Sequence, residues 1–195
     1  MQIITVFIMK KIITILAFMM VISFTVNAQT PMVLSKVIQV DSAKADQIYE
    51  RLELYLTNSF SRPEKTIQLK DKQNHQFIVK TACLFKSVKK NAGNISGGLI
   101  YYTLNIACRD GRYKVDMIDI RHESNRARNE WGPCDFGTLY SDVECPDKKI
   151  AFATKKWKTE IYNEMKDTAK LEFEALCNVL TDATKKATLS QDSNW

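Results

Sequence analysis

The two histidines of this chain are the first residues to examine for chemistry, because imidazole can act as an acid, a base or a metal ligand near neutral pH. Neither His75 nor His122 has a Cys or His partner at the spacing of a zinc site. His122 adjoins Glu123 and follows Arg121, which would attract an anion. Adjacent residues of a strand point to opposite faces, however, so His122 and Glu123 are not expected to act on one substrate atom.

The common catalytic motifs are also absent from the sequence. It contains no G-x-S-x-G nucleophile elbow, no Walker loop and no G-x-G-x-x-G dinucleotide fingerprint. We therefore predict a noncatalytic protein with no cofactor and no metal.

The cysteines suggest one disulfide. Five cysteines are an odd number, so at least one thiol stays unpaired. Cys134 and Cys145 lie in the same predicted loop and are the candidate pair. The other three lie within apolar patterns and are predicted to be buried thiols: Cys83, Cys108 and Cys177.

The N-terminal segment has the three parts of a secretory signal peptide. Met9-Lys10-Lys11 is basic, residues 12–26 are largely apolar, and Val26-Asn27-Ala28 ends in a small residue. We predict a signal peptide over residues 1–28, with cleavage after Ala28 and export to the periplasm or beyond. A retained membrane anchor is the alternative, but the apolar run is shorter than the ~20 residues that a spanning helix needs.

The charge of the chain says little about its partners. The formal net charge is +6, and two of these charges belong to Lys10 and Lys11 of the leader. Lys86, Lys89 and Lys90 form a small basic cluster that would suit nucleic acid in a cytoplasmic protein. Because export is predicted, no nucleic-acid partner is expected.

A β-hairpin is the clearest structural feature of the sequence. Asp110-Gly111 separates two runs rich in Ile, Tyr, Val and Thr, which is typical of a two-residue hairpin turn. Pairing across this turn sets Ile106 opposite Val115, so that one face is apolar. The other face is mixed and is predicted to stay open to solvent; its candidate binding residues are Tyr101, Thr103, Ile118, Ile120 and His122.

The remaining elements place this hairpin in a sheet. Apolar periodicity predicts a helix from about Asp41 to Phe60, capped by Asp41 or Ser42, and a long helix over about 154–187. Further strands are predicted over 36–40, 66–70 and 76–88. The order of elements predicts an α+β domain over 36–187, with both helices on one face of a curved antiparallel sheet. Residues 29–35 form a linker, and 188–195 form a tail.

The irregular segment 124–146 is the second candidate site. Long loops within compact domains are often functional. Its candidate site residues are Trp131, Asp135, Phe136 and Tyr140. The alternative interpretation is packing, in which these side chains anchor the loop or cover the sheet.

Three segments resemble a bacterial family known as domain of unknown function 4468, which has a TATA-binding-protein-like (TBP-like) fold. They are Val37–Asp41, Gly98–Tyr102 and Asp110–Lys114. The resemblance covers roughly residues 36–122 and the last helix. It implies a β-α-β-β-β-β-α order and brings no catalytic residues. A single exported unit is not expected to bind DNA as its namesake does.

Two function classes follow from the sequence. The first is an exported envelope protein without catalytic activity, which binds an envelope protein partner or a ligand through the open sheet face. The alternative is a small-ligand carrier or enzyme with a pocket between the sheet and loop 124–146.

Overall fold

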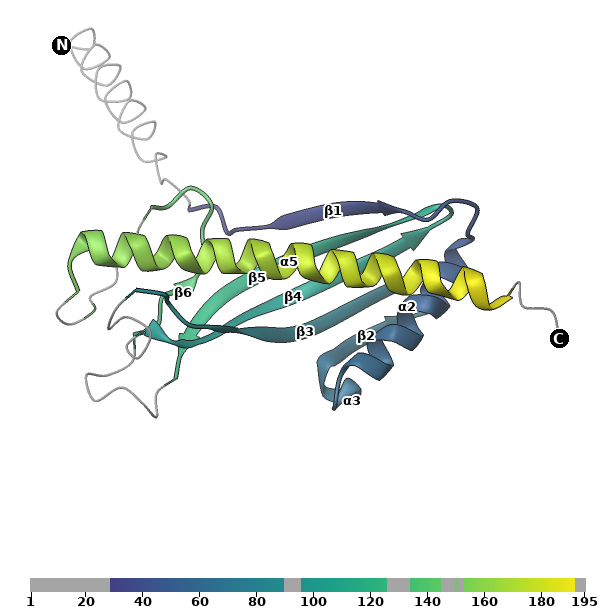
Figure 1. The fold of residues 1–195 in the computed structure, drawn as a ribbon, viewed down its shortest axis with the longest axis horizontal. Helices are drawn as coiled ribbons and strands as arrows, with labels where there is room; N and C mark the ends of the chain where they lie inside the picture. Colours follow the sequence, from purple (N-terminus) through teal and green to yellow (C-terminus); the bar gives the residue numbers. More distant parts are fainter. Residues whose placement is uncertain (1–28, 90–95, 126–133, 145–149, 151–152, 192–195) are drawn as a thin grey trace, which may run out of the picture.

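The computed structural model describes residues 29–89, 96–125, 134–144, 150 and 153–191, with side chains up to residue 185. The predicted leader therefore lies outside the described residues. The elements run in the order β1 (Leu34–Gln39), α2 (Ala45–Ser59), α3 (Pro63–Thr66), β2 (Ile67–Asp71), β3 (Gln76–Phe85), β4 (Gly98–Arg109), β5 (Arg112–Ser124), β6 (Gly137–Thr138) and α5 (Lys155–Gln191) (Figure 1).

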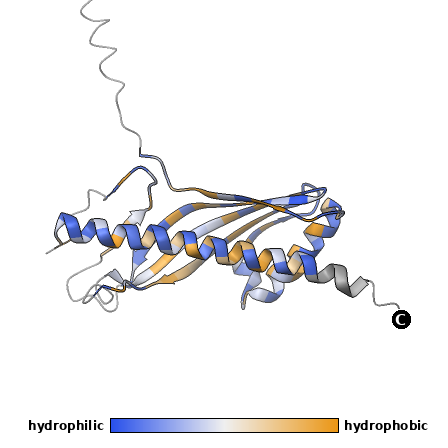
Figure 2. Ribbon diagram, turned by 45° about the horizontal axis from the view of Figure 1, so that its top comes forward, coloured by the Kyte–Doolittle hydropathy of each residue, from blue (hydrophilic) through white to orange (hydrophobic). Residues whose placement is uncertain are grey.

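The strands form one antiparallel sheet in the order β1-β5-β4-β3-β2, and the short β6 pairs with β5. Helices α2 and α5 contact each other and the same face of the sheet (Figure 1). The predicted α+β class, the antiparallel sheet and the two helices on one face are confirmed. Hydrophobic and hydrophilic residues alternate along the strands (Figure 2), as expected for a sheet with one buried face.

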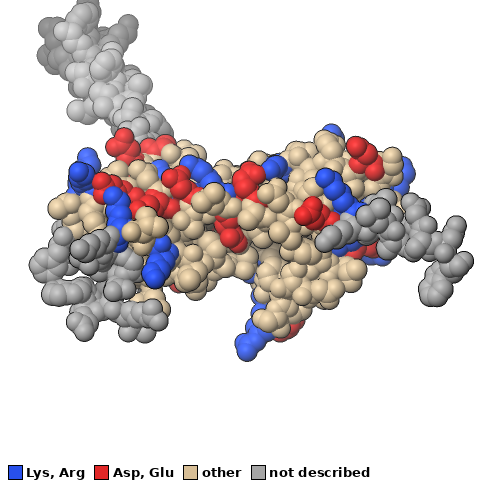
Figure 3. All heavy atoms as spheres, viewed as in Figure 1, with Lys and Arg blue, Asp and Glu red and all other residues tan. Residues whose placement is uncertain are grey.

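Both helices bury the stripe that their periodicity predicted. Ile48, Tyr49, Leu52 and Leu56 of α2 are buried, and the Tyr49 ring stacks on Phe77 of β3 with centroids 4.3 Å apart. From α5, Ile161, Met165, Ala169, Phe173, Cys177 and Leu180 are buried. The outer side of α5 is charged with both signs interspersed (Figure 3), as in the ion pair Lys170–Asp167.

The β4–β5 hairpin has the predicted register near its turn. Ile106 lies opposite Val115, Leu104 opposite Met117 and Thr103 opposite Ile118. Gly111 takes a φ of 75°, as the turn requires.

Beyond Thr103 the predicted register is wrong, because β5 contains a β-bulge. Asp119 has a φ of 54°, and Asp119 and Ile120 together lie opposite the single residue Tyr102. The extra residue reverses the alternation, so that Tyr101 pairs with Arg121 and not with Ile120. Ile120 and His122 consequently face the helices, where they are 1% and 0% exposed.

Helix α2 is capped both by its own Gln47 and from the hairpin. The Gln47 Oε1 accepts a hydrogen bond from the Lys44 N–H at 3.0 Å. The prediction that Asp41 or Ser42 caps it is wrong, because the helix begins after Lys44. A carboxylate oxygen of Asp110 accepts a hydrogen bond from the Ala45 N–H at 2.9 Å, and its second oxygen pairs with the Lys44 Nζ at 2.9 Å. These bonds join the hairpin turn to the start of α2.

Helix α5 is continuous over 37 residues and runs the length of the sheet (Figure 1). Within the described part of the chain, no helix combines the length and the apolar character that crossing a bilayer requires.

Candidate functional site

The sheet face opposite the helices carries a mixed set of side chains. Strand alternation places on it Ile78, Lys80, Ala82 and Leu84 of β3, Leu99, Tyr101, Thr103 and Asn105 of β4, and Asp116, Ile118, Arg121 and Glu123 of β5. Among the described residues, no helix packs on this side. We call it the open face.

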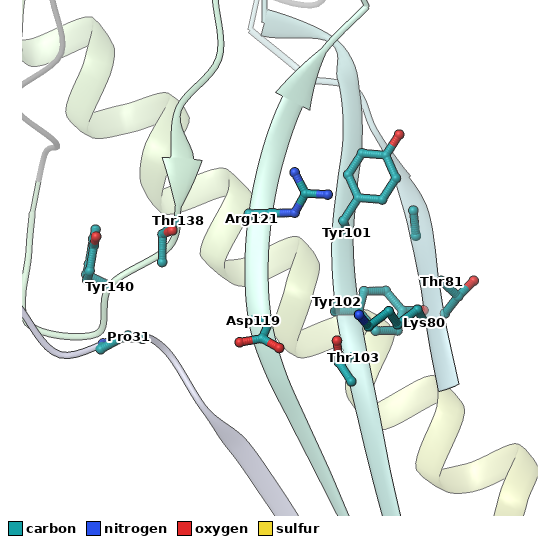
Figure 4. A pocket seen from close by; sticks show the side chains of 11 residues that line it. Pro31, Lys80, Thr81, Tyr101, Tyr102, Thr103, Asp119, Arg121, Thr138 and Tyr140 are labelled. Atoms are coloured by element: carbon teal, nitrogen blue, oxygen red, sulfur yellow. The ribbon is translucent and has the colours of Figure 1, made fainter. Parts of the chain in front are cut away.

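A groove of about 760 Å³ lies on the open face where β5 is bulged. We call it the sheet groove, and its lining residues are Pro31, Lys80, Thr81, Ala82, Tyr101, Tyr102, Thr103, Asp119, Arg121, Thr138 and Tyr140. Figure 4 shows Arg121 beside Tyr101 on neighbouring strands, with Thr138 and Tyr140 on the other side of β5. This volume lies in the range of small-molecule sites, ~300–1,000 Å³.

Arg121 and Tyr101 form the centre of the groove. The Arg121 guanidinium lies 4.8 Å from the centroid of the Tyr101 ring, within the range of a cation–π contact. Arg121 also pairs with Glu123 on the same side of β5. About half of each side chain of this ion pair remains exposed to solvent, so both stay accessible to a ligand.

Two further charged groups line the sheet groove. Lys80 is exposed and forms no ion pair with another described residue. Asp119, the bulged residue, is also exposed. A positive φ at a non-glycine residue is a form of backbone strain that often accompanies functional sites. The groove thus offers two cations, one carboxylate, three tyrosine rings and hydroxyl groups.

The wall that carries Tyr140 is held in place by hydrogen bonds. The Tyr140 N–H donates to the Tyr162 hydroxyl of α5 at 2.6 Å, and Tyr140 forms a β-bridge with Pro31. The Met32 N–H donates to the Leu139 carbonyl at 2.8 Å, and the Leu139 N–H donates to the Ile120 carbonyl at 2.8 Å. This side of the groove is therefore fixed both to the sheet and to α5.

The other described residues of the predicted loop site anchor the loop. A carboxylate oxygen of Asp135 accepts hydrogen bonds from the Ser124 N–H at 2.6 Å and the Ser124 hydroxyl at 2.9 Å. Phe136 is buried, and its ring stacks on that of Tyr162 with centroids 6.1 Å apart. For these two residues the packing interpretation fits. Trp131 lies outside the described residues.

His122 is a core residue. Its ring makes edge contacts with Phe85 and Phe136, and its Nδ1 accepts a hydrogen bond from the Phe136 N–H at 3.3 Å. Glu123 points to the opposite face, as the strand alternation predicted. His75 lies elsewhere, with its Nε2 2.8 Å from the Asp46 carboxylate. Neither histidine lines the sheet groove.

The described cysteines are free thiols. Cys83, Cys108 and Cys177 are unpaired, as predicted. Cys134 is also free, and its burial raises the pKa of the thiol to about 11. Cys145 lies outside the described residues. The structure thus gives no support to the predicted Cys134–Cys145 disulfide.

No cluster of three or more His, Cys, Asp or Glu side chains that could hold a metal ion occurs in the described part of the chain. The structure brings together three of the residues singled out in the two predicted sites, namely Tyr101, Thr103 and Tyr140. Sequence reasoning did not place Lys80 or Asp119 in a site. Arg121 was noted as an anion-attracting residue, but its position beside Tyr101 depends on the bulge.

Comparisons with known proteins identify the fold. Residues 35–123 match the model of DUF4468, described as a domain of unknown function with a TBP-like fold, which confirms the resemblance seen in the sequence. A crystal structure of a TBP-like protein from Parabacteroides distasonis is similar at a TM-score of 0.56 and 15% identity, over 80% of this chain and 93% of that chain. A DUF4468 family protein from Bacteroides ovatus matches at a TM-score of 0.44 and 16% identity, over 80% and 91%. No curated protein matches the chain.

Proposed function

We propose that this chain is an exported bacterial envelope protein without catalytic activity that binds a protein partner or ligand through the open sheet face. Export rests on the signal-peptide pattern of residues 1–28. Binding rests on the sheet groove, which is the observation that carries the proposal.

The groove suits recognition because its groups can make several kinds of contact at once. Arg121 and Lys80 attract negative charge, and the Tyr101 ring supplies a rigid surface for stacking. The described lining contains neither histidine nor cysteine. Its polar groups are hydroxyls, one carboxylate and two cations, which suit hydrogen bonding and charge pairing. A ligand with an anionic group and a flat or apolar part fits this combination.

A second candidate function is a small-ligand carrier. It is favoured by one specific observation, which is that Pro31, Thr138 and Tyr140 wall the groove on the side opposite Tyr101. This candidate differs from the first in the size of the ligand and uses the same surface.

Crosslinking in the native host tests the first proposal. A photoreactive amino acid replaces Tyr101 or, in a matched control, Leu171, which lies on α5 and is 73% exposed. We expect a defined crosslinked product from position 101 and none from position 171. Equal crosslinking from both positions, or none from position 101, would contradict binding at the sheet groove.

Two further measurements separate the remaining parts of the proposal. N-terminal sequencing of the mature protein should begin at Gln29, and intact leader on a membrane-bound protein would contradict cleavage. Native mass spectrometry of protein purified from its host tests the carrier candidate. A bound small molecule that is lost in Tyr140→Ala would favour the carrier over the protein-binding function.

A further inference from the structure

The outer edge of β3 is paired over only part of its length. β4 pairs with β3 along the whole of Gln76–Phe85, whereas β2 pairs only from Gln76 to Val79. Beyond Val79, the described residues place no strand on the outer side of β3. We call residues Lys80–Phe85 the free edge.

The register between β3 and β4 shows which backbone groups of β3 point toward the free edge. The Cys108 N–H donates to the His75 carbonyl at 2.9 Å, and these two residues continue the β3–β4 register. In an antiparallel pair, residues that bond to the partner strand alternate with residues that point away from it. Odd-numbered residues of β3 therefore bond to β4, and the N–H and C=O groups of Ala82 and Leu84 point outward. No hydrogen bond joins these groups to another described residue.

The side chains of the free edge do not protect it. Exposed edges are usually blocked by charges, prolines or bulges, because an unpaired edge is a template for another strand. The run Thr81–Phe85 contains no charge and no proline. Leu84 is 75% exposed, and its neighbour on β4, Leu99, is 37% exposed.

Charged residues lie only at the two ends of the free edge. Lys80 is its first residue and Lys86 follows its last residue, and both are exposed. Neither forms an ion pair within the described part of the chain. A ligand of this edge is therefore complementary if it carries a carboxylate near either end.

We propose that the free edge binds an extended peptide segment of a partner protein, which adds a strand to the sheet beside β3. Backbone hydrogen bonds to Ala82 and Leu84 supply affinity, and an apolar side chain over Leu84 with acidic residues near Lys80 or Lys86 supplies specificity. The inference does not depend on ligand binding in the sheet groove, because affinity for the edge comes from the backbone groups of Ala82 and Leu84, although Lys80 and Ala82 also line the groove.

A second copy of this chain fits the edge poorly. Symmetric antiparallel pairing centred on Ala82 sets Phe85 of the second copy opposite Val79, where Ile67 of β2 already lies. Pairing centred on Cys83 sets Lys80 opposite Lys86 of the second copy, and like charges directly opposite are destabilising. Pairing centred on Leu84 uses only the last residues of β3, because the strand ends at Phe85. A separate peptide avoids all three conflicts.

Amide hydrogen exchange with a synthetic peptide tests the proposal. The probe is a capped peptide of alternating valine and threonine with glutamate at both ends, added to the mature protein at millimolar concentration. We expect exchange of the Ala82 and Leu84 amides to slow by about tenfold or more when the peptide is present. The same peptide with every backbone amide methylated has no N–H donor on either edge and cannot pair as a strand, so it should give no protection.

Variants at one position supply the matched control. Ala82→Pro removes an outward N–H and should abolish binding of the peptide, whereas Ala82→Ser keeps the N–H and should bind as the wild type does. If Ala82→Pro does not fold, the methylated peptide still decides the question.

Three results would overturn the proposal. The first is equal binding of the methylated and unmethylated peptides. The second is a peptide that shifts the NMR signals of Tyr101 and Arg121 while the Ala82 and Leu84 amides still exchange freely with solvent. This result would support binding in the sheet groove alone. The third is protection of Ala82 and Leu84 that rises with protein concentration without peptide, which would assign the edge to self-association.

Discussion

Deleting Asp119 should leave the fold of the domain intact, although removing one residue from the middle of a strand normally turns its side chains to the wrong face. The reason is the bulge. Tyr113, Val115 and Met117 face the helices before it, and Ile120, His122 and Ser124 face them after it. Asp119 is the extra residue between the two series, so its deletion restores a regular alternation. Thr103 would still pair with Ile118, and Tyr101 would still pair with Arg121.

The size of the effect can be worked from the backbone. Asp119 is held at a φ of 54°, a conformation that costs a non-glycine residue about 1–2 kcal/mol. Its removal relieves this cost, but it also straightens β5 and changes its local twist next to Arg121, where β6 pairs. We expect the two effects to offset each other, so that the free energy of unfolding changes by less than about 2 kcal/mol.

Deletion of Asn105 in β4 is the matched control. Asn105 also lies on the open face of a strand, but β4 has no extra residue there that could restore the alternation. Without Asn105, the pairing register of β4 must shift by one residue either before or after this position. The shift that moves fewer residues lies on the turn side and turns Ile106 and Cys108 out of the core, where both are buried. Exposing one large aliphatic side chain costs about 1.5–3 kcal/mol. We expect a total loss of about 3–5 kcal/mol, which is a large part of the usual 5–15 kcal/mol of a domain.

Urea unfolding followed by circular dichroism measures both free energies. The m-value of the Asp119 deletion should equal that of the wild type, because the same surface remains buried. If the Asp119 deletion loses as much stability as the Asn105 deletion, the assignment of Asp119 as the extra residue is wrong.

Three other predictions concern stability. Gly98→Ala should cost about 3 kcal/mol or more in urea unfolding, because its Cβ would lie 2.0 Å from the Glu123 carbonyl oxygen, which is backbone and cannot easily move away. Gly111→Ala meets no atom within 4 Å and should cost only about 1–2 kcal/mol for its positive φ. Equal effects of the two substitutions would contradict this steric argument. Phe136→Ala should cost about 3–5 kcal/mol in the same assay if Phe136 anchors its loop, and a loss below about 1 kcal/mol would show that it does not. Burial raises the pKa of the Cys134 thiol from 9.0 to about 11, so its contribution to stability should be constant below about pH 9 and decline between pH 9 and 11; a pH titration of urea stability that shows no smaller decline in Cys134→Ala than in the wild type would refute this.

Local patterns in the sequence were sufficient to predict most of the architecture. The hairpin register near the turn follows from Asp110-Gly111 and from the apolar alternation on either side of it. The buried stripes of α2 and α5 follow from helical periodicity, because one side of each helix must cover the sheet. The hairpin register and the helical stripes depend on residues that lie close together in the sequence, so a local sequence pattern is enough to predict them.

The features that sequence did not predict depend on contacts between distant segments. The hydrogen bond from the Ala45 N–H at the start of α2 goes to Asp110, which follows Ala45 by 65 residues, so no local capping pattern could indicate it. The bulge at Asp119 is a second case. The run Met117 to Ile120 fits a regular strand equally well in the sequence. The reversed alternation becomes visible only in the structure, where His122 is buried between Phe85 and Phe136. This reversal removed Ile120 and His122 from the predicted binding face and put Arg121 there instead.

The sheet groove and the free edge share Lys80 and Ala82, and this overlap leads to a last prediction. A strand added beside β3 would lie about 4.8 Å from it, with alternate side chains on the open face next to the groove. One partner segment could therefore contact both surfaces. A double-mutant cycle with Arg121→Ala and Ala82→Pro decides whether it does, with the partner found by crosslinking at position 101 as the ligand. If one segment occupies both surfaces, the two losses of binding free energy should be non-additive by about 0.5–3 kcal/mol. If Ala82→Pro leaves the affinity for that partner unchanged, the groove and the edge bind separate ligands, because a segment paired with β3 must lose a backbone hydrogen bond in this variant.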